Sequence, residues 1–202
     1  MNEEKEIKQR IVQKADELFR KFGFSKVTME EIASGLGISK KTLYKHFSNK
    51  EHVLKDLIQT HKCEVDTFID ELMTRQNIPF IEKLKEFMNF IAKQAAKLEE
   101  PMVHDLMKSH PAIWRDIEEF RSKKAHKHLS KLIEDGIEDG IFRSDINNDV
   151  VVAAYVASIQ SLLNPKVLAK LPVSADQAFR DILKILFEGI FTTEGREKYK
   201  SI

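Results

Sequence analysis

Cationic, hydroxyl and aromatic side chains gather between residues 39 and 50, at a density that suits binding to a phosphate backbone. They are Ser39, Lys40, Lys41, Thr42, Tyr44, Lys45, His46 and Lys50. A helix that presents cations from its first turn fits the major groove of DNA. Residues 39–46 contain no Arg, Asn or Gln, so lysine and threonine remain as direct base readers. Taken singly, each lysine could equally be a solvated surface charge, and Tyr44 a half-buried packing residue.

Two short helical patterns that meet at a glycine would position these side chains. Thr28 followed by Glu31 is a capping box, in which hydroxyl and carboxylate each satisfy an unpaired amide at a helix start. Gly37 can adopt a positive φ and end that helix within one residue. Ser39 then offers a hydroxyl cap to a second helix. The pattern predicts a helix-turn-helix DNA reader.

The flanking segments favour helices that brace this reader. In the second short helix, Leu43 and Phe47 are four residues apart and are expected to point inward. Ser48 with Glu51 forms a second capping box pattern, which predicts a new helix over residues 49–74. Upstream, an apolar stripe at helical spacing ends at a glycine, where a third helix should stop.

The stretch as a whole resembles the TetR family of bacterial transcriptional regulators. The matching positions are Ile11, Ala15, Leu18, Phe19, Gly23, Phe24, Val27, Thr28, Ile32, Ala33, Gly37, Ile38, Ser39, Thr42, Leu43, Tyr44, His46, Phe47, Lys50 and Glu51. They cover about the first quarter of the chain, and the resemblance is specific because many spaced positions match in order. The position of Lys41 is often Gly, Ala or Pro in that family, so base preference does not carry over with the fold.

The resemblance implies a recognition helix from Ser39 to about His46, lying in the major groove of double-stranded DNA. Tyr44 and His46 look like the family's phosphate-contacting pair, with Thr28 and Lys50 on the flanking backbone. The side chains nearest the base edges would be Lys40, Lys41, Thr42 and Lys45. The resemblance also implies a regulator, more often a repressor, that binds a palindromic operator as a twofold homodimer and is released by a small molecule.

Charge is unevenly distributed along the chain. The 202 residues carry a net charge of +1, with 33 Lys and Arg against 32 Asp and Glu. Residues 1–62 hold 13 basic against 9 acidic residues, and the remainder holds 20 against 23. The positive bias therefore lies with the predicted reader, and a uniformly basic nucleic-acid coat is excluded.

Three features favour a cytoplasmic protein with no membrane partner. Cys63 is the only cysteine, so no intrachain disulfide can form. The first 20 residues are polar and charged, without the apolar core of a signal peptide. The longest apolar stretch, residues 150–163, is interrupted by polar side chains and is too short to span a bilayer.

Helical periodicity continues almost to the end of the chain, and no alternating strand pattern stands out. The five prolines fall between apolar stripes, where helix boundaries belong, and Gly136 and Gly140 are expected to end the long helix after Pro111. We therefore expect an all-α protein of about nine helices. A three-helix helix-turn-helix DNA-binding domain would occupy residues 1–48, and a larger helical effector-binding and dimerisation domain residues 49–202.

The last two long helical segments are apolar on more than one face. Residues 150–163 are apolar nearly all round, and the final segment opens with a Ser174 to Gln177 capping box. A helix that is apolar on both sides needs partners on both sides, and a second copy of the chain is the simplest one. The residues expected near that dimer interface are Ala153, Ala157, Gln160, Phe179, Leu183, Leu186 and Gly189.

The middle helices contain a group of aromatic, methionine and histidine side chains that suits a hydrophobic or amphipathic effector. The candidate ligand-binding residues are Phe87, Phe90, Ile91, Met102, His104, Met107, His110, Trp114, Phe120 and Leu162. An aromatic and methionine group at helical spacing is more often plain core packing, so the effector itself stays unidentified.

We expect no enzyme, no cofactor and no metal site. The chain has no glycine-rich phosphate loop, carboxylate pair or nucleophile–base motif, and Cys63 lies in a helical stripe that favours an inert thiol. His126 and His128 lie on different helix faces, and His104 with His110 would be a weak metal pair. The alternative function is a DNA-binding protein of the same fold that a protein partner, rather than a small molecule, regulates.

Overall fold

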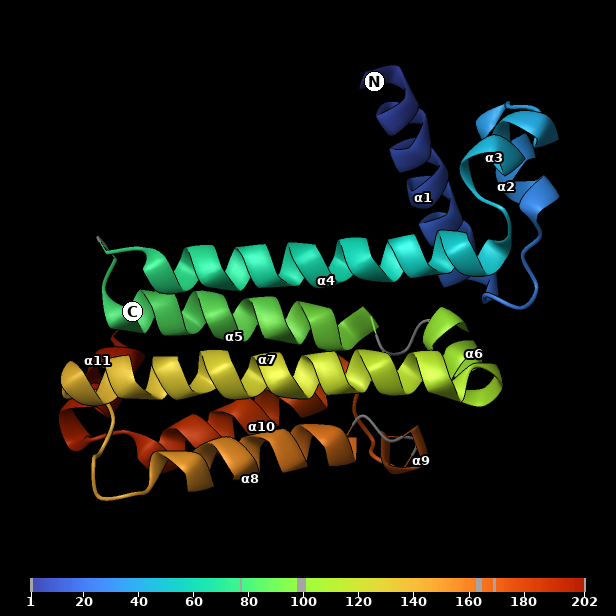
Figure 1. The fold of residues 1–202 in the computed structure, drawn as a ribbon. Coiled ribbons are helices and arrows are strands. Elements are labelled where there is room, and N and C mark those ends of the chain that lie inside the picture. The colour runs from blue at the N-terminus through green and yellow to red at the C-terminus, as the bar shows by residue number, and fades with distance from the viewer. Residues whose placement is uncertain (1, 77, 98–100, 163–164, 169, 202) are drawn as a thin grey trace. The chain divides into compact units, whose positions relative to one another are not determined.

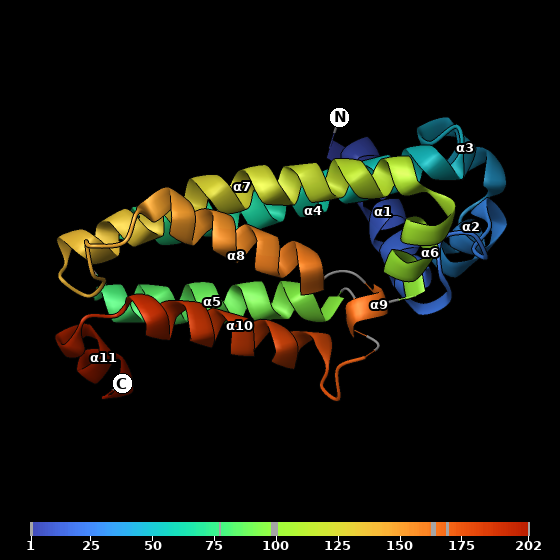
Figure 2. The ribbon, with the colours of Figure 1, turned by 90° about the horizontal axis from the view of Figure 1, so that it is seen from below.

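The computed structural model describes residues 2–76, 78–97, 101–162, 165–168 and 170–201 (Figures 1 and 2). Over these residues the chain consists of helices joined by turns, with one isolated bridge between Phe142 and Phe191. The predicted all-α class is confirmed. The chain divides into two compact units: a reader unit, Met1–Val65 with Glu99–Glu118, and a body unit, Asp66–Leu98 with Glu119–Ile202.

The reader unit begins with the predicted three helices. They are α1 (Asn2–Phe22), α2 (Met29–Leu36) and α3 (Lys40–His46). The unit also contains the first part of α4 (Lys50–Thr74), the whole of α6 (Pro101–Ser109) and the start of α7 (Pro111–Glu138). Helix α1 packs against both α2 and α6, and α2 packs against α3 (Figure 1).

One apolar core holds the reader unit together. Its fully buried large side chains include Phe19, Phe24, Ile32, Leu43, Leu54 and Leu106. Gly23, at φ 87°, turns the chain where α1 ends, as the sequence predicts. Phe24 then packs back edge to face on Phe19, with ring centroids 5.1 Å apart. The turn between α1 and α2 is therefore part of the core.

The body unit consists of the remainder of α4 and α7 together with five further helices. These are α5 (Phe80–Ala96), α8 (Asn148–Leu162), α9 (Pro165–Leu168), α10 (Ala175–Ile190) and α11 (Thr193–Lys200). Helix α10 packs against α5 and α8 (Figure 2). The short helices α9 and α11 are the ones that the expected count of about nine does not include.

An aromatic cluster lies in the core of the body unit. The ring of Phe142 contacts, at centroid separations of 5.3 to 5.7 Å, the rings of Phe80, Phe187 and Phe191. A Cβ atom on Gly136 would lie 2.3 Å from the Phe142 ring, so only glycine fits there. Gly136 therefore serves packing and does not end its helix, because α7 continues to Glu138.

The start of α4 also differs from the sequence expectation. The predicted capping box of Ser48 with Glu51 is wrong, because the helix begins at Lys50 and the side chain of Asn49 accepts an amide of its first turn. The Asn49 side chain accepts the His52 amide at 2.9 Å, whereas the Ser48 hydroxyl contacts His52 Nδ1 at 2.7 Å. Asparagine is among the preferred N-cap residues. At the other end of the chain, the predicted Ser174 cap on α10 is confirmed.

Candidate nucleic-acid interface

Helix α3 separates an apolar inner face from a polar outer one. Leu43 is fully buried and Phe47 is 3 % exposed, as their spacing predicts. On the outer face, Lys41 and Lys45 are exposed and Tyr44 is 48 % exposed. Because the outer face of this short helix carries cations and hydroxyls, it can approach an anionic surface without uncovering the core.

Caps on both sides hold α3 in place. Gly37 ends α2 in the left-handed region (φ 67°), and the Ser39 hydroxyl accepts the Thr42 amide at 3.0 Å. At the start of α2 the predicted capping box is confirmed, since Thr28 and Glu31 exchange hydrogen bonds of 3.2 and 2.8 Å. The hydrogen bonds from Thr28 lower the pKa of the Glu31 carboxyl. The predicted DNA contact of Thr28 would thus use a hydroxyl that already serves the cap.

Lys50 has its ammonium group committed to the turn between α1 and α2. Its Nζ donates to the carbonyl oxygens of Phe24 at 2.7 Å, Val27 at 2.8 Å and Ser25 at 3.3 Å. The same Nζ lies 4.4 Å from the centroid of the Phe24 ring. An ammonium group has three protons to donate, and these contacts occupy them. Lys50 therefore ties α4 to this turn, and its predicted phosphate contact stays a prediction.

The carboxylate of Asp105, in α6, accepts hydrogen bonds from two donors of the same turn. The Ser25 hydroxyl donates to Oδ1 at 2.8 Å, and the Ser25 amide donates to Oδ2. Burial alone would raise the pKa of Asp105, but the hydrogen bonds from Ser25 and Ser109 lower it overall. The ammonium group of Lys50 thus binds the carbonyls of the turn, and the carboxylate of Asp105 binds its Ser25 amide. These contacts join α4 and α6 to the helix-turn-helix.

Two recognition-helix lysines form ion pairs within the reader unit. Lys40 Nζ lies 2.6 Å from Glu30 Oε1 at the start of α2, and Lys45 Nζ lies 2.9 Å from Glu4 Oε1 in α1. Lys41 forms no ion pair with the residues that the structure describes. Sequence reasoning missed both glutamates, because a single acid on an exposed helix face carries no periodic signal.

The ten candidate effector residues are divided between the units. Those in the body unit are Phe87, Phe90, Ile91, Phe120 and Leu162, and those in the reader unit are Met102, His104, Met107, His110 and Trp114. In the body unit, Phe87 is buried, and Phe90 stacks on Phe68 with ring centroids 3.9 Å apart. These body-unit residues stay the better candidates for an effector site, since they come from helices outside the reader core.

Two of the candidates in the reader unit pack within it. Met102 belongs to the reader core, and His110 meets the edge of the Phe24 ring at 4.9 Å. His104 is exposed on α6. Side chains that pack against the α1–α2 turn stabilise the reader, and the effector-binding role of the reader-unit candidates stays a prediction.

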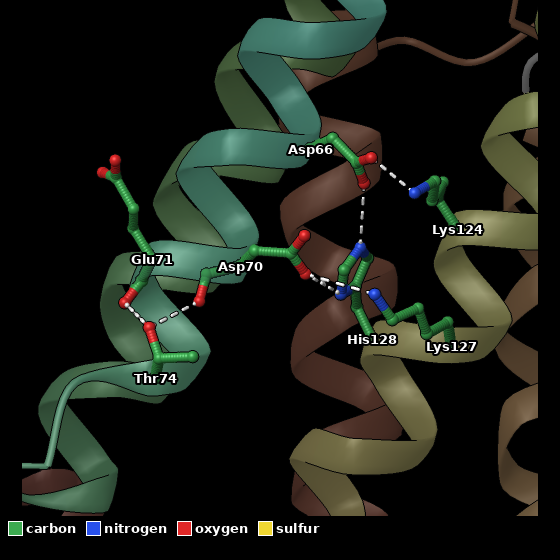
Figure 3. Close-up of polar contacts among 7 residues, drawn as sticks. All are labelled: Asp66, Asp70, Glu71, Thr74, Lys124, Lys127 and His128. Carbon is green, nitrogen blue, oxygen red and sulfur yellow. Dashed lines mark hydrogen bonds and ion pairs between the residues drawn. The ribbon is translucent and has the colours of Figure 1, made fainter.

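A buried histidine with two carboxylate neighbours joins α4 to α7 in the body unit (Figure 3). His128 is 3 % exposed; its Nε2 lies 3.4 Å from Asp66 Oδ1 and its Nδ1 3.7 Å from Asp70 Oδ1. Lys124 pairs with Asp66, and Lys127 Nζ lies 3.3 Å from Asp70 Oδ1. Each helix contributes residues spaced by four, which share one face, but their partners on the other helix cannot be read from spacing alone.

Burial sets the charge state of this cluster. It lowers the pKa of His128 below 6.5, against the opposing effect of the nearby carboxylates. Burial would raise the pKa of Asp66, but hydrogen bonds from Lys124 and His128 lower it overall. A neutral imidazole has one N–H to donate, so His128 can serve only one carboxylate at a time. The ion pairs and the histidine contact of this cluster join α4 to α7.

The predicted dimer residues separate into two groups. Ala153, Ala157, Gln160 and Gly189 are exposed, and Leu186 is half-buried. Phe179 and Leu183 are 5 % and 0 % exposed, so they belong to the protein's own core and not to a free face. Val150 and Ile185, which the sequence analysis did not assign to the interface, are 62 % and 70 % exposed on α8 and α10. Exposure, which periodicity could not assign, distinguishes the two faces of these helices.

Known proteins with similar sequences are DNA-binding regulators. Residues 11–57 match the profile of a family described as bacterial regulatory proteins, tetR family. The chain is 25 % identical to the uncharacterized HTH-type transcriptional regulator YvaF of Bacillus subtilis, over 92 % of this chain and 96 % of that protein. It is 24 % identical to the HTH-type transcriptional repressor KstR2 of Mycolicibacterium smegmatis, over 92 % of this chain and 91 % of that one.

A solved structure shows the same fold along most of the chain. The SmeT–triclosan complex superposes with a TM-score of 0.69 at 13 % identity, covering 92 % of each chain. At that identity the likeness concerns the fold alone. Separately, none of the helices that the structure describes is long and apolar enough to cross a membrane.

Proposed function

We propose that this chain, a member of the TetR family of bacterial transcriptional regulators, represses transcription as a homodimer on a palindromic operator. That family consists of DNA-binding proteins and not of enzymes. We propose further that a small hydrophobic or amphipathic molecule releases it. The observation that carries the proposal is the capped helix α3. Its inner face is buried at Leu43, and its outer face exposes Lys41 and Tyr44 to solvent. Repression is favoured because the relative KstR2 is a repressor.

A palindromic operator follows from twofold symmetry. Two copies related by a twofold axis present two recognition helices to successive major grooves, roughly 34 to 36 Å apart on B-DNA. Selection of bound duplexes from a random pool tests this, and the recovered sequences should contain inverted half-sites about one helical turn apart. Recovery of single, unpaired half-sites would contradict the dimeric mode of binding.

The exposed apolar residues of α8 and α10 support the homodimer. Val150 and Ile185 leave most of their surface in water, although α8 and α10 pack against each other. A Cβ atom on Gly189 would meet nothing within 4 Å, so this part of α10 is open to close approach by another helix. Exposed apolar side chains at helical spacing are typical of an interaction face, and a second copy supplies a matching one.

Sedimentation of an Ile185→Asp variant tests the dimer. We expect the wild-type protein to sediment as a dimer at micromolar concentration and the variant as a monomer, because a carboxylate would be buried without a partner in the interface. Val173→Asp is the matched control, since Val173 is 41 % exposed but precedes α10. A wild-type monomer, or an Ile185→Asp dimer, would refute the assigned interface.

Release by an effector requires a link between ligand and reader. Helices α4 and α7 each run from the reader unit into the body unit, so both units share continuous backbone. The body-unit candidates Phe87 and Phe90 are aromatic, which suits an apolar ligand, and the relative SmeT was solved with triclosan. Coupling of about 1 to 3 kcal/mol between the two sites is typical and sufficient for such a switch. Compounds that bind the protein and lower its operator affinity would support this step, and binding without that effect would contradict it.

A further inference from the structure

Two glutamates hold two of the three recognition-helix lysines. Glu4 Oε1 lies 2.9 Å from Lys45 Nζ, and Glu30 Oε1 lies 2.6 Å from Lys40 Nζ. The four side chains are between 48 % and 69 % exposed, so both ion pairs lie at the surface. The glutamates come from different elements, the start of α1 and the first turn of α2, yet both reach the same short helix.

Both pairs carry full opposite charges near neutral pH. The hydrogen bond from Lys45 lowers the pKa of Glu4, and the hydrogen bond from Lys40 lowers the pKa of Glu30. In return, the hydrogen bond to Glu4 raises the pKa of Lys45. A phosphate that approaches either lysine therefore competes with a carboxylate that is already in place.

Pairing changes the charge that DNA meets at the recognition helix. Of the three lysines on α3, Lys40 and Lys45 are neutralised by a neighbouring acid, and Lys41 remains without an ion pair among the described residues. Non-specific binding to DNA strengthens with the number of phosphates that the protein's cations neutralise. Pairing Lys40 and Lys45 with acids therefore weakens non-specific binding. Exposed ion pairs are weak, so a stronger partner can still displace the carboxylates.

The displaced carboxylates then distinguish one DNA sequence from another. Phosphates are the same along every duplex and repel a carboxylate, so binding to random DNA leaves Glu4 and Glu30 without a donor. In the major groove the amino groups of cytosine and adenine are donors, and they occur only at particular positions. A suitable operator can therefore offset a repulsion that random DNA cannot. Repulsion of wrong partners is a general route to specificity.

We infer that Glu4 and Glu30 are specificity-determining residues that occupy Lys45 and Lys40 in the free protein, weaken attachment to random DNA, and release the lysines only at sites with better partners. This inference rests on the proposed function, because it requires α3 to face DNA. It assigns a role to two acids that would otherwise work against a DNA-binding surface.

The test uses the full-length protein with Glu4→Gln, Glu30→Gln and the double substitution. Affinity is measured by fluorescence anisotropy over a range of salt, on an operator duplex recovered by selection and on a random-sequence duplex of the same length. Each single variant should bind the random duplex about two- to fivefold more tightly, the size expected for losing an exposed competing ion pair. Its salt dependence should also steepen, while operator affinity changes less, so the ratio of the two affinities falls.

Glu17→Gln is the matched control. Glu17 lies on α1 and pairs with Lys14, so the change removes the same charge without freeing a recognition-helix lysine. We expect both duplex affinities of this variant to stay at the wild-type values. Equal gains on both duplexes, no gain on either, or the same gain from Glu17→Gln would overturn the inference. If the wild-type protein binds no duplex at all, the proposed function itself fails.

Discussion

The reader unit and the body unit use the same lysine–carboxylate pairing in opposite settings. In the reader unit, Lys45 and Glu4 are 69 % and 61 % exposed. In the body unit, Lys124 and Asp66 are part-buried beside His128, which is 3 % exposed. An exposed pair contributes little to stability and can be exchanged for another partner, whereas breaking a buried pair leaves a charge uncompensated. The chain therefore has exchangeable charges on the helix that we propose to contact DNA, and fixed charges where two helices are joined.

Removing the central carboxylate of the body cluster should have the largest effect on folding. Asp66→Ala leaves Lys124 without its ion pair and His128 without one of its two carboxylates. We expect the free energy of unfolding to fall by about 2 to 3 kcal/mol, measured by urea unfolding. Glu86→Ala is the control, because Glu86 and its partner Arg75 are 44 % and 42 % exposed, so that pair lies at the surface. Equal losses in the two variants would mean that burial does not distinguish the two kinds of pair.

Lys50 sharpens the comparison, because it is a reader-unit cation that is not exchangeable. Lys50→Ala removes the donor to the carbonyls of Phe24 and Val27, and should lower the free energy of unfolding by about 1 to 2 kcal/mol. Lys41→Ala should leave the melting temperature unchanged, since Lys41 is exposed and forms no ion pair with a described residue.

DNA binding should separate the same two variants. Lys50→Ala should weaken binding to all sequences by loosening the α1–α2 turn, and Lys41→Ala should change the sequence preference, as expected for a side chain near the bases. Competition between duplexes of different sequence measures this difference. If the two variants behave alike in both stability and DNA binding, the assigned roles are wrong.

The pH dependence of stability should show the smallest difference. The folded body lowers the pKa of His128, so folding favours the neutral ring. The resulting contribution to the free energy of unfolding is fully present above pH 6.5 and is lost as the pH falls below it. The contribution of Asp66, whose pKa is also lowered, is lost only as the pH falls below 3.8. Between those two values, His128→Gln should make stability depend less on pH than in the wild-type protein.

Exposed histidines provide the control for that measurement. His126→Gln, on the exposed side of the same helix, should leave the pH dependence between 6.5 and 3.8 as it is in the wild type. Chemical unfolding at several pH values measures both variants. A His128→Gln protein with the wild-type pH dependence would show that the buried ring does not titrate with folding.

Local signals predicted the reader well. The Thr28 capping box, Gly37 and the Ser39 cap are each determined by residues a few positions apart, and the structure has all three. The helical fold of the remaining chain also followed from periodicity, although Gly136 was misread because its role depends on the rings of Phe142 and Phe80 that pack against it. Most contacts within these short segments could be predicted from sequence, because neighbouring residues supply both partners; the exception is the start of α4, where Asn49 instead of Ser48 accepts an amide of the first turn.

Long-range partners could not be predicted. Glu4 and Lys45 are ion-paired across α1 and α3, and Asp66 and His128 across α4 and α7. Nothing in the spacing of either residue indicates the other, because the pairing depends on how the helices pack. For the same reason periodicity assigned Leu183 to a dimer face when it belongs to the core.

The most direct test of the account is the salt dependence of DNA binding by the wild-type protein and by a Lys40→Ala, Lys41→Ala, Lys45→Ala triple variant. We predict that the logarithm of the wild-type binding constant falls linearly with the logarithm of salt concentration. The triple variant should bind more weakly, with a slope flatter by roughly one unit for each phosphate that a lysine no longer neutralises. A wild-type protein with no salt-sensitive binding, or a triple variant with the wild-type slope and affinity, would contradict the claim that α3 is the DNA-contacting helix.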